Sequence, residues 1–356
     1  MVKINGIQIK PQRHCAFLIP SIKEYRKRLD YTRKITSKTS LQRKSSNNFH
    51  LFPCLLRNPK FLSKLNLHLD WKRNYITSKD FYLFSSLTKK VPTLKSLSLT
   101  FSSYSSGLLS TRVLKLYKCF FHQCRFLKCL EINFSTTEIY QDDIFYICQG
   151  IKAIVGLEIL KIDLSSCLGV TDKAIKFLKG LLNRSKNLKH LMINLAFSPS
   201  FSKRTFHSLC DIMLPKLENL ELNIIRNSKP YSIMANSKLL SHLTLRRLSL
   251  GISEAKLSYI SKVILKYSAT LEVIKLKVSH MEVTKSIENK ENTENPFSFF
   301  LQIKKLKSLE LDFSHSKMQL SHTRELWEIL GKLEKISTLK INLLSCDINE
   351  EKSIKL

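Results

Sequence analysis

The chain has 356 residues, and 43% of them are hydrophobic, which is enough for a sizeable core. Its 59 lysines and arginines exceed its 28 acids and give a formal net charge of +31, which attracts nucleic acid, anionic lipid or acidic proteins but indicates no fold. Nine cysteines in a chain of this length exclude a small disulfide scaffold, so we expect free thiols in a reducing compartment. The sequence has no apolar run long enough to span a bilayer and no signal-peptide core. We therefore expect a protein of the cytoplasm, with the nucleus as an alternative.

Residues 1–60 differ from the rest of the chain in composition. They hold fourteen basic residues against two acidic ones, a difference of +12. Ser21–Lys34 is predicted to form one basic helix, and the apolar stretch Phe49–Leu56 is expected to cover the first of the repeats that follow. We predict a basic, partly flexible amino-terminal extension and cap over residues 1–60, and a repeat domain over residues 61–356.

A repeated template organises the second part of the chain. It reads L-x-x-L-x-L-x-Φ, where Φ is a large apolar residue, and its ten copies are separated by 26 to 35 residues. The copies start at Leu62, Leu94, Leu127, Leu157, Leu188, Leu217, Leu245, Leu271, Leu306 and Ile336. The last three apolar positions alternate with other residues, which is the period of a strand that is buried on one face.

Helical patterns lie between the templates. The predicted helices are Ser78–Lys90, Gln141–Ile154, Thr171–Leu182, Ser202–Met213, Ser253–Tyr267, Pro296–Ile303 and Ser321–Leu333. One strand–helix unit cannot bury its apolar face alone, so the units must stack. The predicted fold is therefore α/β: a curved, horseshoe-shaped solenoid of about ten strand–helix repeats, with a parallel sheet on its concave face.

The ten templates resemble the leucine-rich repeats, and their length resembles the ribonuclease-inhibitor-like group. The stretch from Cys167 to Ile175 is similar to the C-x-x-[IV]-T-D-x-x-[LI] core of the cysteine-containing repeats of many F-box substrate receptors. In this stretch Cys167 is expected in the core, and Thr171 is expected to cap the following helix. The usual Asn after the strand is mostly replaced by an apolar residue, and residues 1–60 contain no F-box pattern. The resemblance implies an architecture and a ligand-binding concave sheet.

The side chains between the template leucines face away from the core, because successive strand residues alternate faces. The last of these positions holds Asn or Asp in six repeats: Asn133, Asp163, Asn194, Asn223, Asp312 and Asn342. Two interpretations are open: these side chains bond to neighbouring backbone, or they form a polar stripe for a partner chain. Glu221, Glu310 and Asp312 likewise pair either with a charged partner or with Lys275 and Lys277 on neighbouring strands.

We expect a partner to contact the middle of the arc, because the centre of a concave surface can bury most of a partner's surface. The predicted contact residues are Lys161, Asp163, His190, Asn194, Asn219, Glu221, Asn223 and Arg247.

No catalytic or metal-binding motif stands out in the sequence. The patterns G-x-S-x-G, G-x-x-x-x-G-K-[ST], G-x-G-x-x-G and H-E-x-x-H are absent. Cys119, Cys124 and Cys129, with His122 between them, lack the C-x2-C spacing of a zinc site and are interpreted as packing residues. We expect no enzyme, no cofactor and no metal.

Three functions are consistent with these observations. The first is a monomeric protein–protein interaction module or scaffold that binds its partner on the concave sheet. The second is the substrate-recognition subunit of a ubiquitin ligase, with a divergent amino-terminal element that contacts the ligase core. The third is association with nucleic acid or an anionic membrane through the basic residues 1–60.

Overall fold

The computed structural model describes residues 2–4, 7–9, 63–70, 94–102, 121–122, 124–198, 212, 214–225, 244–253, 257–279, 295–344 and 346–349. The predicted segments Ser21–Lys34, Phe49–Leu56, Ser78–Lys90 and Ser202–Met213 lie wholly or almost wholly outside these residues. Among the described residues, no helix is long and apolar enough to cross a membrane.

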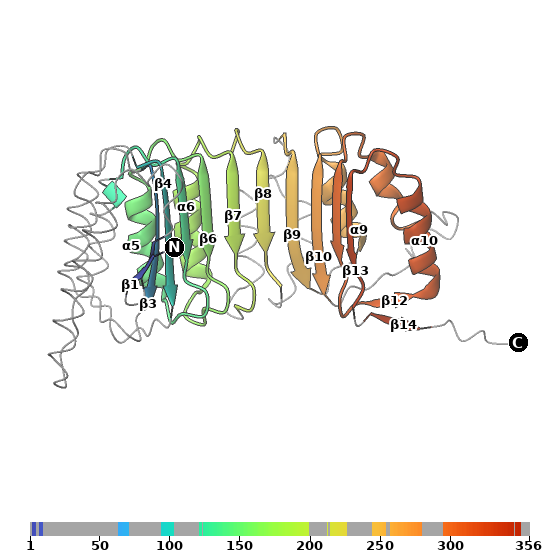
Figure 1. The fold of residues 1–356 in the computed structure, drawn as a ribbon, viewed down its shortest axis with the longest axis horizontal. Helices are drawn as coiled ribbons and strands as arrows, with labels where there is room; N and C mark the ends of the chain where they lie inside the picture. The colour runs from blue at the N-terminus through green and yellow to red at the C-terminus, as the bar shows by residue number, and fades with distance from the viewer. Residues whose placement is uncertain are drawn as a thin grey trace, which may run out of the picture.

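Each of the ten templates forms one strand of a single parallel sheet (Figure 1). The strands follow one another across the sheet in chain order, which confirms the predicted repeat solenoid. They are β3 Lys64–Asp70, β4 Ser96–Ser102, β5 Cys129–Asn133, β6 Ile159–Asp163, β7 His190–Asn194, β8 Asn219–Asn223, β9 Arg247–Ser253, β10 Val273–Ser279, β11 Ser308–Asp312 and β13 Thr338–Asn342.

The alternation of apolar residues sets which face of each strand is buried. In β6, Leu160 and Ile162 are buried, whereas Ile159, Lys161 and Asp163 are only half-buried. All ten strands pair with equivalent positions opposite one another, so the template leucines form continuous rows inside the molecule. The residues that the template leaves unspecified consequently share the other face, which we call the open face of the sheet.

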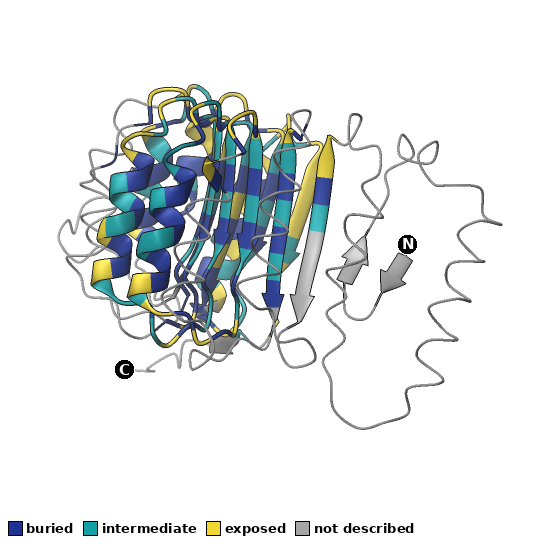
Figure 2. Ribbon diagram, turned by 90° about the vertical axis from the view of Figure 1, so that its left-hand side faces the viewer, coloured by how far each residue is buried: buried dark blue, intermediate teal, exposed yellow. Residues whose placement is uncertain are grey.

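The helices of the described residues lie on the core side of the sheet (Figures 1 and 2). They are α5 Gln141–Ile151, α6 Asp172–Leu182, α9 Leu257–Leu265, α10 Leu320–Gly331 and the short 3-10 helix η6 Ser298–Gln302. The helices α5 and α6 pack side by side, and the rings of Phe145 and Phe177 meet edge to face with their centroids 4.9 Å apart. Several predictions extend past the observed ends of the helices. The apolar pattern continues into the turns, where residues such as Ile154 and Tyr267 are also buried.

The starts of α5 and α6 are linked through their side chains. Asp143 accepts a hydrogen bond from the backbone N–H of Tyr140 at 2.8 Å, and burial raises the pKa of its carboxyl group. Thr171 occupies the cap position of α6 as predicted, but its hydroxyl does not bond to that helix. It donates instead to Oε1 of Gln141 at 2.9 Å, so it joins one repeat to the previous one.

A row of hydroxyl and thiol groups, buried in Cys167, Ser198 and Ser316 and half-buried in Cys346, follows the strands three residues after the last template position. Each donates a hydrogen bond to a backbone carbonyl of the preceding repeat. The bonds are Cys167 Sγ to Phe134 O (3.0 Å), Ser198 Oγ to Leu164 O (3.2 Å), Ser316 Oγ to Val278 O (3.0 Å) and Cys346 Sγ to Phe313 O (2.9 Å). Cys167 is thus buried as predicted, but it also bonds polar backbone that the stacking of repeats removes from water.

Shorter strands lie near the two ends of the sheet. β1 Val2–Ile4 and β2 Ile7–Ile9 pair antiparallel, and β2 lies alongside β3. At the other end, β12 Lys317–Gln319 pairs with β14 Asp347–Asn349. β13 is the last strand of the large sheet, and its template residue Leu339 is 45% exposed, whereas the equivalent Leu309 in β11 is fully buried.

Candidate functional site

The polar residues at the strand ends bond to their own backbone. In all six repeats the side-chain Oδ1 accepts a hydrogen bond from the backbone N–H two residues later, over 2.8 to 3.3 Å. The accepting residues are Asn133, Asp163, Asn194, Asn223, Asp312 and Asn342. This is the Asx turn, in which a short polar side chain organises the chain after a strand. The backbone interpretation of this row is therefore confirmed.

The same turns contain backbone that ordinary residues seldom adopt. The third residue after four of these side chains has a positive φ of 59 to 61°, as in Thr136, Ser166, Phe197 and His315. Such a residue reverses the chain so that its N–H reaches the next repeat: the N–H of Thr136, for example, donates to Ser165 O at 2.9 Å. The strand ends consequently repeat the same geometry along the sheet.

Charged side chains on the open face pair with one another across neighbouring strands. The ion pairs are Lys161–Glu131 (2.7 Å), Lys275–Glu310 (3.1 Å) and Lys277–Asp312 (3.5 Å), and Nε2 of His190 shares a hydrogen bond with Glu221 (3.1 Å). The hydrogen bond with Glu131 raises the pKa of Lys161, and the hydrogen bond with His190 lowers the pKa of Glu221. A partner that brings its own charge must therefore compete with pairs that already exist.

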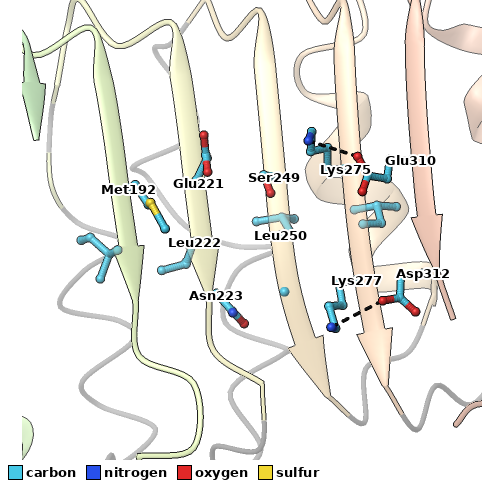
Figure 3. Close-up of a pocket in the computed structure, with 13 residues that line it drawn as sticks. Met192, Glu221, Leu222, Asn223, Ser249, Leu250, Lys275, Lys277, Glu310 and Asp312 are labelled. Atoms are coloured by element: carbon cyan, nitrogen blue, oxygen red, sulfur yellow. Dashed lines mark ion pairs between the residues drawn. The ribbon is translucent and has the colours of Figure 1, made fainter. Parts of the chain in front are cut away.

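The open face has a hollow over β9, with a volume of about 310 Å³ (Figure 3). It exists because β9 places Ser249 and Gly251 on this face, where neighbouring strands place longer side chains. A Cβ atom at Gly251 would lie 2.4 Å from Oδ1 and 2.8 Å from Cγ of Asn223, so glycine leaves room for the Asn223 side chain where it lies, between β8 and β9 (Figure 3).

The walls of the hollow differ in chemistry. Met192 and Glu221 lie on the β7–β8 side (Figure 3). Lys275 and Lys277 stand on the β10 side, where they form ion pairs with Glu310 and Asp312 of β11, which also line the hollow (Figure 3). The hollow therefore offers an acid and a thioether on one side, two lysine–acid ion pairs on the other, and a floor of small residues.

The structure places all eight predicted contact residues on the open face of β6 to β9. Two of them, Glu221 and Asn223, line the hollow. Asp163 accepts hydrogen bonds from Ser165 and from the amide of Asn194, so its oxygens are already occupied. The prediction did not include the β9 to β11 side of the hollow. The sequence signal for the hollow was the pair of small residues in β9, Ser249 and Gly251. This pair becomes informative only when it is compared with the longer side chains on the neighbouring strands.

Four of the described cysteines have low chemical reactivity. Burial raises the pKa of Cys129, Cys167 and Cys346, and raises that of Cys148 to about 12. These thiols stay protonated at neutral pH and are poor nucleophiles. No group of three His, Cys, Asp or Glu residues among the described positions is arranged to hold a metal; Cys119 of the candidate zinc set lies outside them.

A second set of ion pairs lies at the starts of the strands. Glu158 accepts hydrogen bonds from the side chains of Lys128 and Lys189, and these bonds lower its pKa to about 2. A carboxyl group whose pKa is lower in the folded chain stabilises the fold above its ordinary value of 4.5 and loses this effect as the pH falls towards 2.

We therefore expect Glu158→Gln to make folding stability less dependent on pH between about 5 and 2, the window that separates the two pKa values. The measurement is the midpoint of urea unfolding as a function of pH. Glu334→Gln is the matched control, because this exposed acid forms no ion pair with another described residue. An identical pH profile for Glu158→Gln and the unmodified chain would contradict the expectation.

Comparisons with known proteins give only weak likenesses. No family model matches the chain, and no curated protein matches it. The crystal structure of a Bacteroides fragilis protein has 17% identity and a TM-score of 0.45, and the match covers 77% of this chain and 74% of that one. The structure of the Rad7 and Elc1 complex in yeast has 14% identity and a TM-score of 0.38, with coverage of 94% and 92%. Both likenesses are too weak to support an argument about this chain.

Proposed function

We propose that this protein is an interaction module that binds a partner protein on the open face of its sheet, centred on the hollow over β9. The observation that carries the proposal is the hollow itself. It is formed where one strand presents Ser249 and Gly251 between strands with longer side chains. Tight protein interfaces concentrate their binding energy where an anchoring side chain fills such a depression and excludes water.

The electrostatics of the open face favour shape and hydrogen bonding as the source of specificity. Its lysines and acids are largely paired across strands, so the face offers little net charge for long-range attraction. A partner gains most by inserting an uncharged or hydrogen-bonding side chain between Glu221 and the two lysine–acid pairs, which leaves those ion pairs intact. Because such a partner is recognised by shape and hydrogen bonds, it need not be acidic, although the whole chain is strongly basic.

The side chain of Ser249 gives a direct test, because it points into the hollow and not into the core. Ser249→Trp should fill the hollow without loss of stability. Ser98→Trp is the matched control, since Ser98 occupies the same position in β4, on the same face but outside the hollow.

The measurement is quantitative affinity purification of the full-length chain from cells that contain its natural partners. We expect at least one protein to be recovered equally with the unmodified chain and with Ser98→Trp, and to be depleted about tenfold or more with Ser249→Trp, as for the loss of a central anchor. If every recovered protein is indifferent to Ser249→Trp, the proposal is wrong.

A further inference from the structure

Within the described part of the chain, the segments that lead into the strands and the segments that follow them differ in charge. The described segments that lead into the strands are residues 94–95, 124–128, 152–158, 183–189, 214–218, 244–246, 266–272, 303–307 and 332–337, and we call them the strand-start edge. They contain fifteen lysines and arginines and four acids. The described segments that follow the strands are residues 134–140, 164–171, 195–198, 224–225, 313–316 and 343–344. They contain no lysine or arginine and one acid, Glu138.

Part of the charge at the strand-start edge has a structural role. The residues immediately before seven consecutive strands alternate in sign: Lys128, Glu158, Lys189, Glu218, Arg246, Glu272 and Lys307. Glu158 pairs with the lysines on both sides, and Glu272 pairs in the same way with Arg246 and Lys307. This inner row therefore neutralises most of its own charge and holds neighbouring strands in register.

The excess positive charge lies further out, in the turns that precede this inner row. The outer group is Arg125, Lys152, Arg184, Lys186, Lys216, Lys266, Lys304, Lys305, Lys332 and Lys335, with Glu334 as its single acid. All of the basic residues except Lys152 are exposed. Cations near helix carboxyl ends are favoured by the helix dipole, but that effect is confined to the last turn and does not account for ten basic residues in a row of turns.

Two apolar side chains protrude from the same turns. Phe126 is 67% exposed beside Arg125, and Val155 is 80% exposed in the next turn along the edge. The strands start in exact register, so their turns end at a common level, and exposed residues line this edge (Figure 2). The edge is thus a level, basic surface about 40 Å long, at roughly 4.8 Å per strand, with apolar side chains standing out from it.

We propose that the strand-start edge binds an anionic membrane surface. The outer lysines and arginines face the lipid head groups, and Phe126 and Val155 enter the interface between head groups and acyl chains. Clusters of basic residues gain attraction from anionic lipids, and apolar side chains on the same surface add burial. Val155 distinguishes this partner from nucleic acid, because an aliphatic side chain cannot stack on a base as an aromatic one does. The surface differs from the open face and from residues 1–60, so it does not depend on either.

The test uses the full-length chain and sedimentation with vesicles of phosphatidylcholine, with and without phosphatidylserine. The edge variant replaces four outer residues: Arg125→Gln, Lys152→Gln, Arg184→Gln and Lys186→Gln. The control variant removes the same number of charges elsewhere: Lys173→Gln, Lys176→Gln, Arg324→Gln and Lys340→Gln. At about 1 kcal/mol per basic residue near the surface, the loss of four basic residues should make the edge variant bind phosphatidylserine vesicles about 1,000-fold more weakly. The control variant should bind like the unmodified chain, and equal losses in the two variants would overturn the proposal.

A second variant separates the membrane from other polyanions. Phe126→Ser with Val155→Ser removes two exposed side chains, so it should not disturb folding. It should weaken vesicle binding about tenfold, because it removes the apolar area that enters the interface. Binding of a single-stranded RNA oligonucleotide serves as the comparison. If the unmodified chain prefers the oligonucleotide, or if vesicle binding is unchanged in this variant, the membrane assignment is wrong.

Discussion

Replacing Leu160 by alanine is expected to lower the free energy of unfolding by about 2–5 kcal/mol, as for other fully buried leucines. Leu160 has no exposed surface and stands in the middle of the row of template leucines, between Leu130 and Leu191. The cavity that alanine leaves cannot collapse easily, because the backbone on both sides is held by parallel strand pairing. The measurement is urea unfolding followed by far-UV circular dichroism.

Leu339→Ala is the matched control for this prediction. Leu339 holds the same template position in β13, but it is 45% exposed because no further repeat covers it. Its replacement should cost less than about 1 kcal/mol, since little apolar area is removed from the core. Equal losses at the two positions would mean that the template leucines do not stabilise the fold through burial between repeats.

Ser316→Ala is expected to lower the free energy of unfolding by about 1–3 kcal/mol, which is large for the loss of one oxygen atom. Ser316 is fully buried, and its hydroxyl donates to Val278 O at 3.0 Å. Alanine removes this donor while the carbonyl stays away from water. Ser316→Cys should retain most of the stability, because Cys167 and Cys346 make the equivalent bond in other repeats. A cysteine variant as unstable as the alanine variant would contradict this account of the row.

The positions of the strands were predictable because each strand must bury one of its two faces. A residue such as Leu160 must face the core and Lys161 must not, and the two-residue period of a strand converts that requirement into a pattern that recurs ten times. The helix ends were less predictable, because Ile154 and Tyr267 are as apolar as the helical residues before them yet lie in turns. The hydrogen bonds of the donors after the strands were not predicted, because Cys167 was expected only to pack in the core and a single serine such as Ser198 forms no sequence pattern.

The sequence predicted which face of the sheet holds the candidate site, but not the position of the site on that face. Alternation places His190 and Arg247 on the open side of the sheet, but it does not say where that side is deep enough to hold a partner's side chain. Depth depends on side-chain sizes on neighbouring strands, and it appears only when Ser249 stands beside Glu221 and Lys275. The charge of the strand-start edge was also not predicted, because the basic residues can be assigned to this edge only when the exact bounds of the strands and helices are known.

The central claim, that a partner protein sits on the open face, is tested most directly by lysine-reactive cross-linking of the complex recovered by affinity purification, with mass spectrometry to locate the linked residues. Lys161, Lys275 and Lys277 report on the open face, whereas Lys173 and Lys176 report on the outer surface of α6. We expect partner cross-links at Lys275 and Lys277, beside the hollow, and their loss in Ser249→Trp. Partner cross-links confined to Lys173 and Lys176 would contradict the account.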